Sequence, residues 1–134
     1  MRLTRRYQFC ASHRLDVPAL TAEQNRRLFG KCNNPYGHGH DYTLDVTVEG
    51  APDDSGQVAN RAALDAWVSE TVLQKLDHQN LNADVAALAG VVPTTENLAG
   101  AIRDVLARDW PLRARLARVR IAETDRNIFE LGWE

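Results

Sequence analysis

The stretch "HGHDYTLDVTVE", residues 38–49, alternates between two kinds of side chain along its whole length. One set of alternate positions is polar, whereas the other carries two histidines followed only by aromatic and aliphatic residues: His38, His40, Tyr42, Leu44, Val46 and Val48. Successive side chains of a β-strand point to opposite faces, so this pattern predicts a strand that is buried on one face. Both histidines then lie on the apolar face of that strand.

A second strand is predicted before this one. Residues 3–13 also repeat with a period of two, and this run ends at His13 on its mainly apolar face. The segment between the two strands, "TAEQNRRLFGKCNNPYG" (21–37), is rich in Asn, Gly and polar residues, which predicts a loop with one helical turn near residues 22–28. Because sequential strands usually pair, His13 is expected to meet His38 and His40 at one end of a sheet.

The C-terminal half predicts two helices and two further strands. Asn60 is a suitable cap for an amphipathic helix that ends near Asp77, and "PTTENLAGAIRDVLARDW" (93–110) predicts a second helix with a threonine cap. Residues 78–92 read as a loop, and residues 116–123 and 128–131 read as strands. The order β-β-α-α-β-β favours an α+β fold in one domain, residues 1–134, with a four-stranded antiparallel sheet and two helices on one face.

Composition limits the partners of the protein. The 134 residues carry a net charge of -2, which provides no large field for nucleic acid or an anionic membrane. No apolar run approaches the roughly 18 residues of a membrane span, and "MRLTRRYQF" lacks the apolar core of a signal peptide. We therefore expect no nucleic-acid or membrane partner, a cytoplasmic location, and free thiols at Cys10 and Cys32.

The histidines are the strongest indication of chemistry. The chain has four, and three of them, His13, His38 and His40, are expected to converge. Three neutral imidazoles leave an open position on Zn²⁺, as catalytic zinc sites do. Cys32 leaves two alternatives open, because it is either a reactive thiol beside the metal or a fourth ligand that closes a non-catalytic, structural zinc site.

Two further features carry possible roles in a reaction. Asp77 and His78 adjoin each other at a helix end, where a histidine can interact with the helix dipole, but an acid, a histidine and a thiol are also the parts of a proton relay. Glu123 shares a strand face with Val119 and Ile121, and a carboxylate among apolar neighbours needs a donor. That donor is either an arginine or the guanidine-like edge of a pterin or guanine.

Five segments of the sequence match one family: "RRYQFCASHRL", "LFGKCNNPYGHGHDY", "LDHQNLN", "VVPTTENLA" and "IAETDRNIFE". They occur in the family's order over nearly the whole chain, which thus resembles the 6-pyruvoyltetrahydropterin synthases and the related 6-carboxytetrahydropterin synthases. The resemblance implies three groups of site residues: zinc ligands His13, His38 and His40; catalytic residues Cys32, Asp77 and His78; and pterin-binding residues Glu123, Thr95 and Glu96.

The resemblance also implies an assembly. In the tunnelling fold of this family, β-β-α-α-β-β subunits join their sheets into a barrel as a trimer, and two trimers stack into a homohexamer. The active sites lie between subunits. Closure of the barrel would remove the free edges of an isolated sheet.

The implied reaction converts 7,8-dihydroneopterin triphosphate into 6-pyruvoyltetrahydropterin with loss of triphosphate, and it needs zinc but no nicotinamide or flavin. The alternative product is 6-carboxytetrahydropterin, formed with release of acetaldehyde and triphosphate for the queuosine and deazapurine pathway. The interval of five residues between Cys32 and His38 favours the pyruvoyl type.

The sequence departs from the family pattern at two positions. Cys10 stands where serine is common, and Asp41 stands where asparagine is usual in the segment that carries the histidines. Cys10 belongs to the polar face of its strand and is expected to be incidental. Asp41 is expected to change the hydrogen bonds around the zinc histidines.

Overall fold

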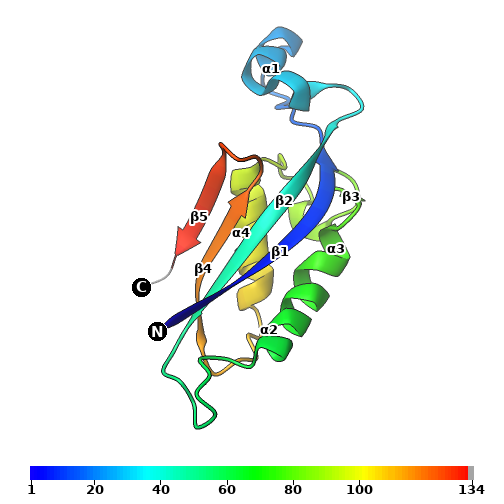
Figure 1. The fold of residues 1–134 in the computed structure, drawn as a ribbon. Coiled ribbons are helices and arrows are strands. Elements are labelled where there is room, and N and C mark those ends of the chain that lie inside the picture. Colours follow the sequence, from blue (N-terminus) through cyan, green and yellow to red (C-terminus); the bar gives the residue numbers. More distant parts are fainter. Residues whose placement is uncertain (133–134) are drawn as a thin grey trace.

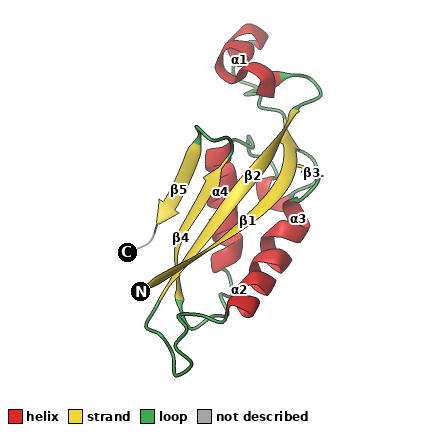
Figure 2. Ribbon diagram, viewed as in Figure 1, coloured by secondary structure: helices red, strands yellow, loops and turns green. Residues whose placement is uncertain are grey.

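The computed structural model describes residues 1–132, which form a twisted sheet with helices on one face (Figures 1 and 2). The order of the strands across the sheet is β3-β1-β2-β4-β5. Their bounds are β1 (Arg2–His13), β2 (His38–Glu49), β3 (Gln79–Asn80), β4 (Arg115–Ala122) and β5 (Ile128–Gly132). The four longer strands pair with one another in antiparallel fashion, as the predicted α+β fold requires.

Two helices cover the sheet, as predicted. The first begins as α2 (Arg61–Val68), continues through a π-helical turn (Ser69–Leu73) and ends as α3 (Gln74–Leu76), and we call this continuous unit helix α2–α3. The second is α4 (Thr95–Ala107). Each begins at the expected cap, because the side chain of Asn60 or Thr94 accepts a hydrogen bond from a backbone N–H of the first turn.

The prediction of a purely antiparallel, four-stranded sheet is wrong at one edge. β3 lies in the segment predicted as a loop and pairs in parallel with residues Ala11 and Ser12 of β1. The chain turns into this position at His78, whose φ of 60° is in the left-handed region and whose N–H donates to the Cys10 carbonyl at 2.6 Å. Two residues are too short a strand for any periodicity to show in the sequence.

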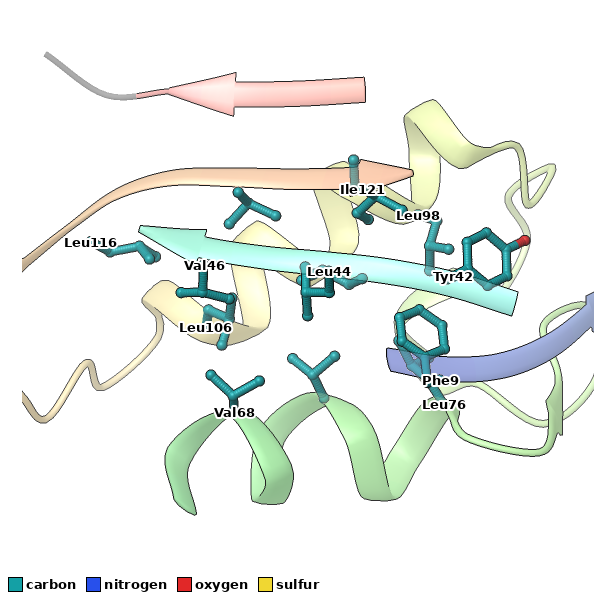
Figure 3. Packing of buried hydrophobic residues seen from close by; sticks show 14 of the residues in the cluster. Phe9, Tyr42, Leu44, Val46, Val68, Leu76, Leu98, Leu106, Leu116 and Ile121 are labelled. Atoms are coloured by element: carbon teal, nitrogen blue, oxygen red, sulfur yellow. The ribbon is translucent and has the colours of Figure 1, made fainter. Parts of the chain in front are cut away.

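The core lies between the sheet and the two helices. β2 is the central strand, pairing with β1 on one side and β4 on the other, and its core-facing side chains from Tyr42 to Val48 are fully buried. Figure 3 shows Tyr42, Leu44 and Val46 of this strand together with Val68 of helix α2–α3 and with Leu98 and Leu106 of α4, which belong to the same cluster. The apolar face predicted for residues 38–49 is therefore the middle of the core.

The segment between β1 and β2 extends beyond the end of the sheet (Figure 1). It contains α1 (Ala22–Phe29), which is longer than the predicted single turn because a capping box joins Thr21 and Gln24. A 3-10 turn (Gly30–Asn33) follows. The chain then returns at Gly37, where φ is 80° and a Cβ atom would lie 2.8 Å from the His13 carbonyl oxygen, so glycine is required at this return.

No helix within residues 1–132 combines the length and the apolar character that crossing a membrane requires.

Leu44 provides a test of the core. Its side chain is fully buried at the centre of β2, so Leu44→Ala should lower the free energy of unfolding by about 2–5 kcal/mol. Leu28 on α1 is 63% exposed, and Leu28→Ala removes the same atoms from an exposed position and should change stability by less than about 0.5 kcal/mol. Urea denaturation compares the two, and equal losses would contradict this assignment of the core.

Candidate active site

Four residues that can bind a metal converge at the end of the sheet near α1. They are His13 at the end of β1, Cys32 in the 3-10 turn, His40 on β2 and Glu123 directly after β4, and one ligand atom from each lies within 4.8 Å of all the others. Segments far apart in the sequence thus place two imidazoles, a thiol and a carboxylate around one point.

The backbone fixes the orientation of His13. Its side chain is buried, and Nδ1 lies 2.9 Å from the carbonyl oxygen of Pro93. Because a carbonyl can only accept, Nδ1–H donates this hydrogen bond and Nε2 keeps its lone pair for the cluster. Burial is the largest effect on the ring and lowers the pKa of His13, which keeps the imidazole in the neutral form that a metal needs.

His40 is the centre of the cluster. Its Nε2 atom lies 3.1 Å from Nε2 of His13, 3.0 Å from Oε1 of Glu123 and 3.7 Å from Sγ of Cys32. Burial lowers the pKa of His40 as well.

These separations fit one tetrahedral zinc ion. Zn–N and Zn–S bonds of about 2.05 and 2.3 Å imply N···N and N···S edges of about 3.3 and 3.6 Å. The observed 3.1 Å between His13 and His40 and 3.7 Å between His40 and Cys32 are close to these edges. The donor types, imidazole nitrogen, thiol sulfur and carboxylate oxygen, are also those that zinc prefers.

The third predicted ligand, His38, lies beside the cluster but not within it. Strand parity places it next to His40, with ring centroids 4.7 Å apart and planes at 84°. It is also the direct cross-strand partner of His13. The ligand atoms that converge belong to His13, Cys32, His40 and Glu123, and His38 is not among them.

Cys32 is a neutral thiol at the cluster. Burial, followed by the negative charge of Glu123, raises the pKa of Cys32 above its usual value. Loss of the proton therefore requires additional positive charge nearby.

Asp77 and His78 form a pair, with 3.1 Å between Oδ2 and Nδ1. The backbone N–H of Cys10 donates to Oδ1 of Asp77 at 2.9 Å and is the main reason why the pKa of Asp77 is lowered. Within residues 1–132 of one chain, this pair has no hydrogen bond or ion pair with Cys32. The structure thus brings the predicted acid and histidine together but leaves the predicted thiol apart from them.

The residues predicted to bind a pterin divide into two groups. Glu123 is at the cluster, where its carboxylate faces the two imidazoles, and its side chain is only 14% exposed. Thr95 is buried at the start of α4, whereas Glu96 beside it is exposed.

Tyr42 is a polar group that the sequence analysis missed as a site residue. Its ring stacks on Phe9 and contacts the edge of His40, with centroids 5.0 and 5.6 Å apart (Figure 3 shows Phe9 and Tyr42). Its hydroxyl and that of Thr95 are buried without a well-formed hydrogen bond within the described residues. The alternation in residues 38–49 places Tyr42 on the same strand face as the two histidines. This shared face was the signal in the sequence that could have identified Tyr42 as a site residue.

The two departures from the family pattern contact each other. Cys10 and Asp41 are cross-strand partners, and the Cys10 thiol donates to Oδ1 of Asp41 at 2.8 Å. This hydrogen bond raises the pKa of Cys10 more than any other effect. Asp41 is therefore an acceptor for Cys10 on the polar face of β2, and its side-chain hydrogen bond goes to this thiol rather than to a histidine.

The fold and the donor set define an α+β protein with a zinc-type site at one end of its sheet. The chain belongs to the 6-pyruvoyl tetrahydropterin synthase family, whose model matches residues 2–133.

Individual relatives agree with this assignment. The 6-pyruvoyl tetrahydrobiopterin synthase of Homo sapiens is 49% identical over 127 residues, which are 94% of this chain and 87% of the human protein. The solved 6-pyruvoyl tetrahydropterin synthase of Caenorhabditis elegans has a TM-score of 0.89 and 35% identity, covering 100% of this chain and 96% of that one. A dihydroneopterin monophosphate aldolase of Pyrococcus furiosus is 34% identical over 96 residues, covering 72% of this chain and 78% of the aldolase.

Proton release on zinc binding separates the two ligand sets. At about pH 8 the lowered pKa values keep His13 and His40 neutral, whereas the raised pKa keeps Cys32 protonated, so only a bound thiolate releases a proton from these groups. With three imidazole ligands, wild type and Cys32→Ala should release equal numbers of protons in calorimetric titrations made in two buffers. One extra proton from wild type would show that Cys32 is a ligand. Because burial lowers the pKa values of His13 and His40 below the ordinary imidazole value of about 6.5, protonation of these two rings should weaken zinc binding only at pH values below it.

Proposed function

We propose that this protein is a zinc-dependent lyase that converts 7,8-dihydroneopterin triphosphate into 6-pyruvoyltetrahydropterin with loss of triphosphate. The observation that carries the proposal is the cluster of His13, Cys32, His40 and Glu123 in a chain that is 49% identical to the human 6-pyruvoyl tetrahydrobiopterin synthase. The reaction rearranges hydrogen within the substrate, so no nicotinamide or flavin is needed.

Zinc is proposed to be held by His13, His38 and His40. The lone pair of His13 Nε2 already faces the cluster, and His38 and His40 lie next to each other on β2. Bound zinc supplies a Lewis acid that makes the C–H bonds beside the coordinated side-chain oxygens more acidic.

Cys32 is proposed to move protons on the substrate side chain. Its sulfur lies 3.7 Å from Nε2 of His40, in the turn before β2, and in this proposal it faces a substrate carbon while the three histidines hold the metal. Burial and the negative charge of Glu123 raise the pKa of Cys32. The thiolate would therefore form only when bound zinc offsets these two effects. Asp77 orients His78, which is proposed to transfer the proton on the other side of the substrate.

The pterin ring is proposed to bind at Glu123 and the start of α4. A carboxylate accepts two parallel hydrogen bonds from a guanidine-like edge, and the position of Glu123 at the cluster brings that edge close to the thiol. The buried hydroxyls of Thr95 and Tyr42 would supply further polar contacts at this end of the core, and the exposed Glu96 would add a carboxylate.

The active site is proposed to be shared between two subunits of a homohexamer. Within one chain, Cys32 has no hydrogen bond or ion pair with the Asp77–His78 pair, which supports the proposal. A second copy can bring its Asp77–His78 pair to Cys32 of the first. Exposed edges at β3 and β5 suit joining of sheets into a barrel. A cytoplasmic location is part of the proposal and is supported by two free cysteines.

Two other reactions act as alternatives. The first is formation of 6-carboxytetrahydropterin from the same substrate. The second is an aldolase reaction, because a dihydroneopterin monophosphate aldolase of Pyrococcus furiosus is 34% identical to this chain over 96 residues. The pyruvoyl product is favoured because the human relative is more similar, at 49% identity over 94% of the chain, than the aldolase at 34% over 72%.

Identification of the product tests the reaction. Incubation of the zinc-loaded protein with 7,8-dihydroneopterin triphosphate should yield triphosphate and a pterin with the mass of the 6-pyruvoyl compound, without acetaldehyde. Release of acetaldehyde with a carboxylated pterin would assign the alternative reaction. No turnover by a zinc-loaded, folded sample would contradict both.

Mixing two inactive variants tests the shared site. Cys32→Ala and His78→Ala should each lose about 10²–10⁴-fold in turnover, because each removes a group that transfers protons. If each site takes Cys32 from one subunit and His78 from the next, about a quarter of the sites in randomly mixed oligomers have both residues intact and regain activity. The measurement is turnover after the variants are unfolded and refolded together. No recovery, with mixed oligomers shown by mass spectrometry, would place both residues of a site in one chain.

A further inference from the structure

A groove of about 700 Å³ lies away from the cluster, between helix α2–α3, α4 and the loop that contains residues 84–88. None of the site residues described above lines it. Its volume is within the range of pockets that hold small molecules. Figure 2 shows the two helices that form its sides on the same face of the sheet.

The inner surface of the groove is aliphatic. It is lined by side chains that belong to the core and are buried: Val72, Leu76, Leu88, Leu98 and Ile102. The large hydrophobic residues that are exposed within residues 1–132, such as Tyr36 and Val91, do not line it. A recessed apolar surface of this kind suits a small molecule better than the flat face of a protein partner.

The π-helical turn is an independent feature of the same place. Two of its residues, Thr71 and Val72, line the groove. Thr71 is held by a 2.7 Å hydrogen bond from its hydroxyl to the Trp67 carbonyl. π-Helical turns inside α-helices are rare and occur frequently at functional sites.

Two cationic side chains line the groove without ion-pair partners. Lys75 and Arg108 are exposed, and neither forms a salt bridge within the described chain. Lys75 follows the lining residue Val72 by three positions, so it lies one turn further along the same side of helix α2–α3, and Arg108 directly follows the last residue of α4. The carboxylate of Asp84 also lines the groove but accepts the Asn80 N–H at 3.0 Å within its own turn. The groove is therefore apolar inside and has an excess of positive charge.

We propose that this groove binds a small carboxylate with an elongated apolar body. The aliphatic floor between Leu76, Leu98 and Ile102 takes the body, and Lys75 and Arg108 take the anionic group. This site is separate from the proposed pterin chemistry and does not depend on it.

Decanoate is the probe for the test, and titration calorimetry with the zinc-loaded wild-type protein is the measurement. The double variant Lys75→Gln/Arg108→Gln should bind decanoate about tenfold more weakly or worse, because both charges are lost. Arg26→Gln is the matched control, since Arg26 is an exposed, unpaired arginine on α1, and it should bind as wild type does. Decan-1-ol should bind more weakly than decanoate.

A variant that fills the groove tests whether decanoate binds in the groove and not elsewhere on the protein. Ala87 is an exposed lining residue, so Ala87→Trp should occupy the groove while leaving the core intact, and it should abolish decanoate binding. Chemical shifts of Thr71, Leu88 and Val105 should move on titration of wild type. The proposal is overturned if wild type does not bind decanoate, if the double variant and Arg26→Gln bind alike, or if decan-1-ol binds as well.

Discussion

The pairing of β1 with β2 is the constraint on which the site depends. In this register His13 lies opposite His38, and Ala11 lies opposite His40, so the two histidines of β2 and the last residue of β1 share one face at one end of the sheet. A slip of one residue would turn His13 and the core side chains of β1 to the other face. The fully buried core-facing residues of β2, from Tyr42 to Val48 in alternate positions, make such a slip costly, and the core therefore fixes the geometry of the imidazoles.

The same strands separate the groups of the proposed proton relay. Cys32 meets the imidazoles on the core face, whereas the Asp77–His78 pair is held by the Cys10 backbone at the edge where β3 joins β1. A single chain thus offers two half-sites, each with its own charged or polar partners. In the proposed hexamer, joining of subunits would complete each half-site with the other half from a neighbour. His78 is exposed beside Asp77, whereas His13 and His40 are largely buried, so the proposed reaction would use the two places for different steps.

Strand parity predicted the meeting of His13 and His40 at one end of the sheet, and local backbone geometry accounts for what parity did not predict. The alternation in residues 38–49 located both histidines and the central strand, since burial of one face leaves a direct pattern in the sequence. β3 could not be predicted, because it depends on the left-handed conformation of His78 and is only two residues long. The carboxylate of Glu123 faces the imidazoles, and that orientation depends on the turn after β4, which carries no periodic signal.

The proposed function requires that the register of β1 and β2 let His13, His38 and His40 hold zinc while the Cys32 thiol stays free of it. X-ray absorption at the zinc edge of the loaded protein tests it most directly, since Zn–N and Zn–S bonds of about 2.05 and 2.3 Å are resolved in such spectra. The prediction is a first shell of nitrogen and oxygen alone, with the multiple scattering of three imidazoles. A sulfur scatterer at about 2.3 Å that is lost in Cys32→Ala would contradict the claim and make the thiol a zinc ligand.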